Sequence, residues 1–96
     1  MKAGDLWECY GWVKRGRQRR AVIRELRDKP TSPQEFRRKL NSGSSSQLSL
    51  REVSRHFTTF TAKGLMKCIT PAEPYGRLYV LTDKGRRVQE EVSKEE

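Results

Sequence analysis

Segments that would place this chain in or across a membrane are missing from its sequence. No apolar run approaches the roughly eighteen residues that a membrane-spanning helix needs. Residues 1–8 also lack the apolar core of a signal peptide. We therefore expect a cytoplasmic protein that has no membrane partner.

Residues for catalysis and metal binding are scarce as well. The only histidine, His56, has no nucleophile or orienting partner near it in the sequence. Cys9 and Cys68 do not combine with His56 in a spacing typical of zinc sites, and both are expected to be reduced in the cytosol. Gly43 lies in a serine-rich segment without the lysine of a phosphate-binding loop. We expect no catalytic residue, no metal, no cofactor and no enzymatic activity.

Basic residues, in contrast, are abundant, and the formal net charge is +9. Residues 1–29 hold nine Lys and Arg against four Asp and Glu, and residues 30–64 hold six against two. Residues 65–96 hold six of each. The first two thirds of the chain therefore favour a polyanionic partner, and nucleic acid is the main candidate; the alternative is a soluble protein that happens to be basic.

The length of the chain predicts one domain over residues 1–96, with a small core. Residues 1–15 form either an N-terminal arm or a short helix, in which Leu6, Tyr10 and Val13 would share one face. The aromatic residues of this segment must pack on the core or on a second subunit.

Two helices are predicted next. The first covers residues 17–28 and ends before Pro30. The second begins at Pro33, after Ser32 as its cap in a capping box with Glu35, and ends near residue 40. Residues 41–47 are expected to form a flexible linker. The buried residues of the two helices are predicted to be Val22, Ile23, Leu26, Phe36 and Leu40.

The first of these helices also carries a row of arginines opposite its apolar side. Such a row is more typical of a solvated helix face than of a phosphate site. Its members are Arg17, Arg20, Arg24 and Arg27.

The strongest helix signal follows the linker and predicts a helix over residues 49–63. Ser49 and Glu52 are spaced as a capping box, and Gly64 is a stop signal. The apolar stripe of this helix is Val53, Phe57 and Phe60.

After this helix, the alternation of side chains predicts antiparallel strands at residues 65–70 and 78–82. Residues 71–77 would form the loop between them, and a last helix would cover residues 83–94. The predicted buried residues of the last helix are Val88 and Val92.

The outer side of the helix at residues 49–63 has the chemistry of a reading head for duplex DNA. Arg51 and Arg55 can make bidentate contacts to guanine in the major groove. The amide of Ser49 lies at a helix N-terminus, which is a favourable place for a phosphate. The alternative is an ordinary solvated face. The candidate DNA-binding residues of this helix are Ser49, Arg51, Glu52, Ser54, Arg55, His56, Thr58 and Thr59.

The loop at residues 71–77 would act as a wing beside that helix. Tyr75 and Arg77 can touch the DNA backbone or enter the minor groove, although Glu73 opposes phosphate contact and a plain turn is the alternative. Phosphate contacts that position the protein are expected from a basic cluster on the preceding helix. That cluster is Arg37, Arg38 and Lys39.

Four segments carry a resemblance to a known family. They are residues 10–16 with 20–26, residues 49–55, residues 63–65 and residues 76–85. The last contains the pattern Leu-Thr-x-x-Gly from Leu81 to Gly85. Through these segments the chain resembles small archaeal winged-helix transcriptional regulators of the broad MarR/ArsR-like group.

The resemblance implies a DNA-binding dimer with its third core helix in the major groove and the wing alongside. It places Ser49, Arg51, Glu52, Arg55 and His56 on the DNA side. The chain departs from the family pattern where residues 41–47 replace a tight turn. It also departs in the wing, where Pro71, Pro74 and Tyr75 stand at positions that are often basic.

We therefore predict an α+β, mostly α, winged helix-turn-helix with a three-helix core, a two-stranded wing and a C-terminal helix. The predicted function is sequence-specific binding of double-stranded DNA in transcriptional regulation. A protein-interaction winged helix within a larger nucleic-acid-associated complex is the alternative. We also expect a homodimer, because the N-terminal aromatics and the Val88/Val92 face exceed what a core of this size requires.

Overall fold

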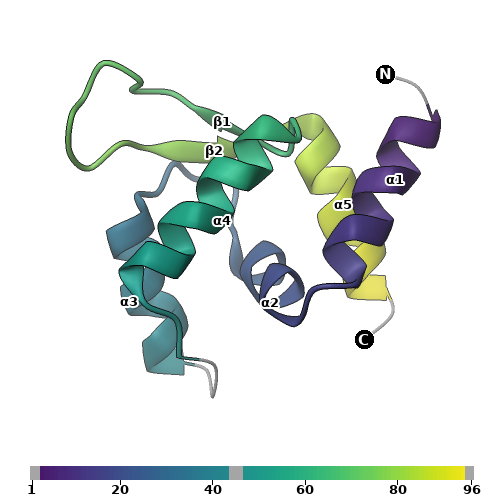
Figure 1. Ribbon diagram of the computed structural model, residues 1–96, viewed down its shortest axis with the longest axis horizontal. Helices are drawn as coiled ribbons and strands as arrows, with labels where there is room; N and C mark the ends of the chain where they lie inside the picture. Colours follow the sequence, from purple (N-terminus) through teal and green to yellow (C-terminus); the bar gives the residue numbers. More distant parts are fainter. Residues whose placement is uncertain (1–2, 44–46, 95–96) are drawn as a thin grey trace.

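The computed structural model describes residues 3–43 and 47–94, which form an α+β fold that is mostly helical (Figure 1). Five helices and one two-stranded antiparallel sheet lie within these residues. The elements are α1 (Ala3–Lys14), α2 (Arg17–Glu25), α3 (Pro33–Gly43), α4 (Leu50–Ala62), β1 (Met66–Cys68), β2 (Tyr79–Leu81) and α5 (Asp83–Lys94).

Helix α1 lies beside α5, so the first and last helices of the described chain pack together, with the two termini at opposite ends of the pair (Figure 1). Of the two forms predicted for residues 1–15, the structure has the helix. Its buried face is Leu6, Cys9 and Val13, whereas Tyr10 is only partly buried. The buried face thus includes Cys9, which was not predicted, and Tyr10 packs against its edge.

Helix α2 ends at Glu25, three residues before the predicted end. Leu26 already has an extended backbone, and its side chain enters the core at 3% exposure. The carbonyl oxygens of Ile23 and Leu26 accept hydrogen bonds from Gln89 Nε2 of α5, both at 2.7 Å. A partner distant in the sequence therefore satisfies carbonyls that further helix would have paired.

Helix α3 begins at Pro33 as predicted and runs three residues further than predicted, to Gly43. Half of the expected capping box forms: Glu35 N donates to Ser32 Oγ at 3.2 Å, while the Glu35 carboxylate pairs with Lys39 at 3.3 Å. The predicted linker 41–47 therefore begins inside a helix, and residues 44–46 lie outside the described residues.

The link between α3 and α4 is held closed by one asparagine. The Asn41 side chain accepts from Leu48 N at 3.1 Å and donates to Leu48 O at 3.0 Å. Arg37 Nε donates to the same carbonyl at 3.2 Å, and the Leu48 side chain is buried. These bonds place the start of α4 relative to α3.

Helix α4 is close to the predicted helix in extent and in its buried face. Both hydrogen bonds of the Ser49–Glu52 capping box are present. Gly64 ends the helix with a positive φ of 79°, and Leu65 N donates to Phe60 O at 2.8 Å, which satisfies a terminal carbonyl. Its fully buried apolar residues are Val53, Phe57 and Phe60.

The two strands pair in the predicted antiparallel manner but are shorter than predicted, with Met66 opposite Leu81. Thr31, just before α3, exchanges two backbone hydrogen bonds of 2.9 Å with Tyr79 on the other side of β2. This contact, which the sequence did not predict, ties the hairpin to the start of α3.

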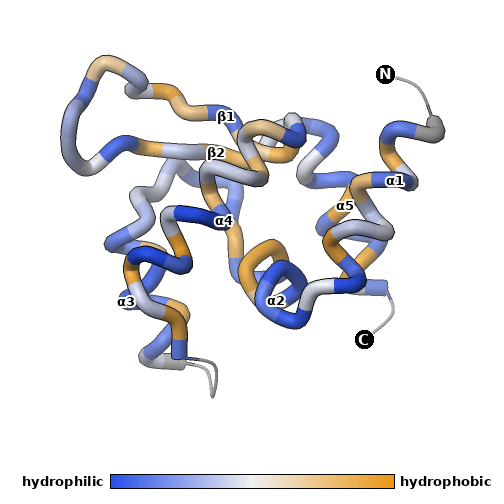
Figure 2. Tube along the Cα trace, in the orientation of Figure 1, coloured by the Kyte–Doolittle hydropathy of each residue, from blue (hydrophilic) through white to orange (hydrophobic). Residues whose placement is uncertain are grey.

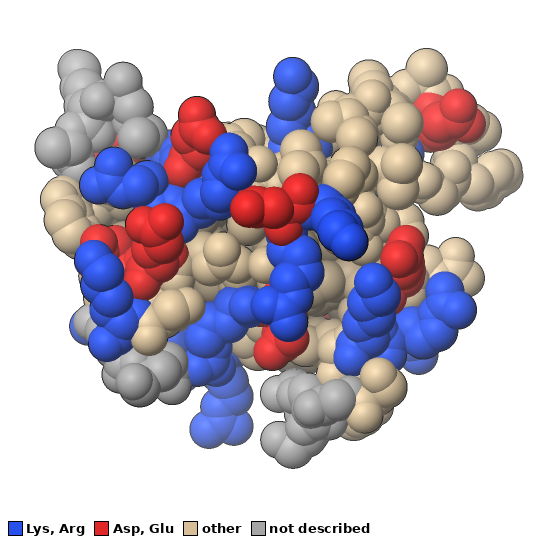
Figure 3. Space-filling view, turned by 180° about the vertical axis from the view of Figure 1, so that it is seen from behind, with Lys and Arg blue, Asp and Glu red and all other residues tan. Residues whose placement is uncertain are grey.

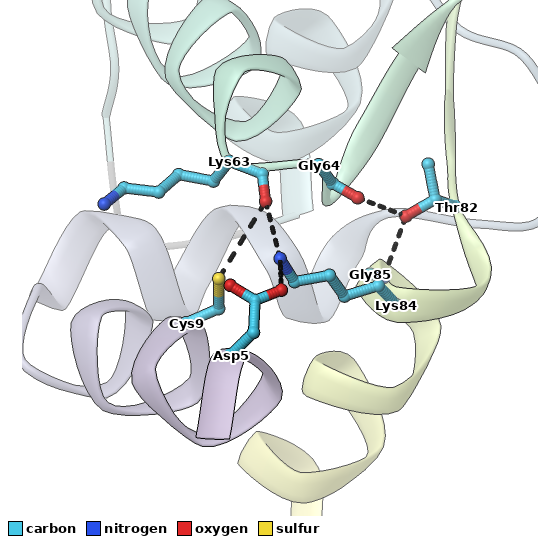
Figure 4. A network of polar contacts seen from close by, with 7 residues as sticks. All are labelled: Asp5, Cys9, Lys63, Gly64, Thr82, Lys84 and Gly85. Carbon is cyan, nitrogen blue, oxygen red and sulfur yellow. Dashed lines mark hydrogen bonds and ion pairs between the residues drawn. The ribbon is translucent and has the colours of Figure 1, made fainter. Parts of the chain in front are cut away.

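The segment Leu81 to Gly85 is a structural joint (Figure 4). Thr82 Oγ1 accepts from Gly85 N at 3.0 Å, which caps α5, and donates to Gly64 O at 2.6 Å. A Cβ atom at Gly85 would overlap the Leu65 carbonyl oxygen and lie 3.0 Å from Leu81 Cδ2. Glycine is therefore required where the start of α5 meets the end of α4.

Lys84 closes the same joint from α5. Its Nζ donates to Asp5 Oδ2 at 2.6 Å and to Lys63 O at 2.9 Å, so that it links α1 with the C-terminus of α4 (Figure 4). The Asp5 carboxylate raises the pKa of Lys84 above its ordinary value. Cys9 Sγ lies 3.9 Å from the same Lys63 carbonyl.

Along each helix, hydrophilic and hydrophobic residues alternate, as expected of elements that surround one core (Figure 2). Val88 and Val92 of α5 are 0% and 2% exposed and belong to this core. The interpretation that they form a surplus face for a second subunit is therefore wrong. No helix among the described residues combines the length and apolar character needed to cross a bilayer.

Candidate nucleic-acid interface

The outer side of α4 presents two neighbouring rows of side chains. The first, the arginine stripe, consists of Arg51, Arg55 and Thr59. The second, the groove stripe, consists of Leu50, Ser54 and Thr58. Both follow from spacings of four residues, which bring side chains onto one helix face.

The arginine stripe carries two positive charges that have no ion-pair partner among the described residues. Arg51 and Arg55 are exposed, and neither forms an ion pair with a carboxylate in the described parts of the chain. Two free guanidinium groups one helical turn apart can donate paired hydrogen bonds to an external acceptor.

The orientation of these arginines is held by the opposite side of the same helix. Phe57 packs against Phe36 of α3 and Tyr79 of β2, with ring centroids 5.4 Å apart in both pairs. Phe60 packs against Trp12 of α1 at 5.7 Å. Because α4 packs against α1, α3 and β2, its rotation is fixed and its exposed stripes point in one direction.

The groove stripe borders an open groove of about 440 Å³. The groove lies between α4, the start of α3 and the loop of the hairpin at residues 71–77. Ser54 and Thr58 line one side, and Tyr75 and Arg77 line the other. Leu50 also lines it and is 42% exposed, so an apolar side chain borders the groove beside polar groups.

The basic cluster on α3 is exposed, but two of its three members already bond within the protein. Lys39 forms an ion pair with Glu35 on the same helix, and Arg37 Nε donates a hydrogen bond to Leu48 O. The Lys39 pair is well hydrated, with side chains 76% and 46% exposed, so it contributes little to stability. Arg38 is exposed and forms no ion pair within residues 3–43 and 47–94. Arg37, bonded to Leu48 just before α4, is the member of the cluster that lies near the start of the arginine stripe. Lys39 instead borders a pocket with Arg27.

Glu52 and His56 both meet α2. His56 points inward, which corrects its placement on the outer face, whereas Glu52 is half-buried at the edge of that face. Gln18 Nε2 of α2 donates to Glu52 Oε2 at 2.9 Å, and Gln18 Oε1 lies 2.9 Å from His56 Nε2. Since the carboxylate can only accept, the Gln18 amide oxygen faces His56, and His56 Nε2 carries the proton. His56 is only 8% exposed.

The same surroundings set two pKa values. Burial lowers the pKa of His56, and the positive charges of Arg55 and Arg19 lower it further. Hydrogen bonds from the Ser49 backbone and from Gln18 lower the pKa of Glu52. At neutral pH the network therefore holds a carboxylate and a neutral imidazole.

Three hydroxyl residues differ in what they offer a ligand. The Ser49 amide donates to Glu52 Oε1 at 3.0 Å, so the protein's own carboxylate takes the place that we had assigned to a phosphate. Thr58 and Thr59 donate their hydroxyls to the carbonyls of Ser54 and Arg55, and each keeps an oxygen that can accept.

The hairpin loop lies fully on the surface. Its residues 71–77 are all exposed, and Tyr75 reaches 88% exposure. Arg77 Nε donates to Glu73 O at 2.8 Å, and Gly76 has a positive φ of 65°, which favours glycine at this turn. The loop thus presents one aromatic side chain and one guanidinium to the groove.

Charge on the opposite side of the molecule is mixed. In the view from behind, Lys and Arg alternate with Asp and Glu over the surface (Figure 3). On α5, Arg86 pairs with Asp83 at 2.6 Å and with Asp28 at 3.3 Å. The uncompensated arginines of α4 differ from this pattern.

Sequence reasoning missed two residues of this region. Gln18 had no signal, because its partners are 34 and 38 positions away. The signal for Leu50 was weak: it is an apolar residue directly after the Ser49 cap that does not belong to the predicted apolar stripe. Elsewhere in the described residues, no group of three His, Cys, Asp or Glu side chains converges as a metal site would require.

Comparisons with protein-family models, with curated proteins and with solved structures found no match to the chain.

Proposed function

We propose that the chain is a winged helix-turn-helix that binds double-stranded DNA with sequence preference and acts in transcriptional regulation. In this proposal α4 enters the major groove and the hairpin loop serves as the wing. The order of α2, α3, α4 and the hairpin supports this assignment, as does the Thr31–Tyr79 contact that ties the hairpin to α3.

The observation that carries the proposal is the pair Arg51 and Arg55 on a helix whose other side is fully buried. Arginine forks suit the O6 and N7 acceptors of guanine, and the N-terminal half of a reading helix meets base edges. The basic cluster on α3 would contact phosphates, and Tyr75 with Arg77 would reach the adjoining backbone or minor groove.

Selection of bound sequences from random duplexes by the full chain tests this proposal. We expect enrichment of a motif containing guanine. We also expect the affinity for a selected duplex to fall steeply as salt rises, because phosphate contacts release counterions. Absence of enrichment together with a flat salt series would contradict the proposal.

A protein-interaction module is a second candidate, and exposed aromatic residues favour it. Trp7 on α1 is 51% exposed and meets Tyr10 edge-on, and Tyr75 stands out from the hairpin loop. An NMR titration with mixed duplex DNA at low salt separates the two candidates. Shifts at residues 49–60 and 75–77 support DNA binding, whereas no shifts would favour a protein partner.

We include dimerisation on DNA in this proposal. Because Val88 and Val92 are buried, its support is the exposed Trp7 side chain of α1. Two copies would contact half-sites about 34–36 Å apart, one turn of the duplex. Sedimentation of the full chain at high concentration tests this; a monomer throughout would contradict it.

A further inference from the structure

One apolar side chain stands at the reading end of α4. Leu50 occupies the first position of the helix and is 42% exposed, directly after the Ser49 cap. It does not belong to the buried face of Val53, Phe57 and Phe60. A large apolar group in this place gains free energy only when a partner covers it.

The surroundings of Leu50 restrict what that partner can be. Leu50 is followed at intervals of four by Ser54 and Thr58, and these three line the groove beside the hairpin loop. Arg51 and Arg55 stand on the next row of the same helix without ion pairs in the described chain. The partner must therefore offer an apolar group next to hydrogen-bond acceptors and negative charge.

Duplex DNA has this combination in its major groove. The C5-methyl group of thymine is the apolar feature there, and it adjoins the acceptors of neighbouring bases and the phosphates of the backbone. An acidic protein surface also offers apolar groups and carboxylates that could pair with the two arginines. The formal net charge of +9 favours a regular polyanion such as duplex DNA over such a surface.

We propose that Leu50 reads a thymine methyl group and that the groove stripe and the arginine stripe together select thymine next to guanine. This inference rests on the DNA-binding function proposed above and names the bases that this site prefers. Leu50 then sets specificity, while Arg51 and Arg55 supply polar readout.

Replacement of thymine by deoxyuridine tests the inference, because it removes the methyl group and keeps base pairing. The probe is a duplex selected by the full chain, compared with the same duplex in which single thymines are replaced. We expect one such replacement to weaken binding about fourfold, the loss expected for one buried methyl group.

The preference for thymine over deoxyuridine must depend on Leu50. In Leu50→Ser, and equally in Leu50→Ala, we expect both duplexes to bind alike. Ile69→Ser is the matched control, because Ile69 is also 42% exposed and does not line the groove. That variant should keep the preference for thymine. Circular dichroism verifies that each variant is folded.

The outcomes are distinct. Equal binding of the thymine and uracil duplexes by the unmodified protein would overturn the inference while leaving DNA binding intact. A methyl preference that persists in both Leu50 variants would also overturn it, since another residue would then read the methyl group. Failure to select any duplex would instead overturn the proposed function, and the inference with it.

Discussion

Two regions of this molecule use the same type of charge in opposite ways. At the joint of α1, α4 and α5, Lys84 is largely buried, with a side chain 14% exposed, and donates to a carboxylate and a carbonyl. On the outer side of α4, Arg51 and Arg55 are exposed and form no ion pair with the described residues. Lys84 already has internal hydrogen-bond partners and stabilises the fold. Arg51 and Arg55 have no ion-pair partner among the described residues and can therefore bind an external anion.

The largest effect is expected at the joint, from Gly85→Ala. The new Cβ would overlap the Leu65 carbonyl, so the start of α5 must move away from the end of α4. We expect the free energy of unfolding to fall by about 3 kcal/mol or more, as for other overpacked sites. Chemical denaturation measures this.

Gly11→Ala is the matched control for that substitution. Gly11 lies inside α1, and its added Cβ would meet only Arg15 Nη1, at 3.6 Å. Alanine is favoured over glycine inside a helix by about 0.5–1 kcal/mol, so this variant should be as stable as the unmodified protein or more so. Equal losses in both variants would contradict the structural role of Gly85.

The exposed cations are tested by Arg55→Ala. We expect binding to a selected duplex to weaken by about 1–3 kcal/mol, with relaxed preference at one position, because a bidentate base contact is lost. Stability should be unchanged, since Arg55 forms no ion pair in the described chain. Fluorescence anisotropy with the selected and with shuffled duplexes measures both affinity and preference.

Arg87→Ala controls for the removal of one positive charge. Arg87 is exposed on α5, away from α4. It should change affinity little and leave preference unaltered. If Arg55→Ala bound with unchanged affinity and unchanged preference, α4 would not be the reading helix.

Lys84→Met should show the reverse pattern, with lower stability and unaltered base preference. The change removes hydrogen bonds to Asp5 and Lys63 while keeping most of the buried stem. Because Asp5 is half exposed, we expect a loss of only about 1 kcal/mol. Lys94→Met, which breaks an exposed pair on the same helix, should cost almost nothing. Similar melting temperatures for both variants would contradict the stabilising role of Lys84 at the joint of α1, α4 and α5.

The smallest effect concerns His56. Because its pKa is lowered in the folded state, protonation favours unfolding. Its contribution to stability is complete above about pH 6.5, the ordinary value, and is lost as pH falls from there towards the lowered pKa. Relative to His56→Gln, which keeps a donor towards Gln18, the unmodified protein should lose under about 1 kcal/mol between pH 7.5 and 5.5. Parallel stability curves would contradict this.

Local signals in the sequence predicted part of the fold and of the site. The Ser49–Glu52 capping box, the stop at Gly64 and the exposure of Arg51 and Arg55 were confirmed. Each depends on neighbours within one or two helical turns, where spacing alone decides which side chains meet. The DNA partner remains a prediction.

Contacts between distant segments were not predictable in this way. The end of α2 depends on Gln89 of α5, and the inward position of His56 depends on Gln18. Residues 41–43 were expected in a linker but belong to α3, whose neighbour Leu48 is held by Asn41. In the first two cases the deciding partner comes from another helix, and in the third it comes from the segment that follows α3.

By itself, the sequence determined where α4 begins and ends, which of its sides is buried, and that the chain is strongly basic. Helix caps and apolar spacing act over a few residues, so they are written locally in the chain. Tertiary structure decided which charged side chains bond to other parts of the protein and which can bind an external partner. Lys84 and Arg55 look alike in sequence, and only the packing of α1 and α5 against the end of α4 gives Lys84 its partners. Charge is a property of a residue, but its availability depends on what the fold brings within hydrogen-bonding distance.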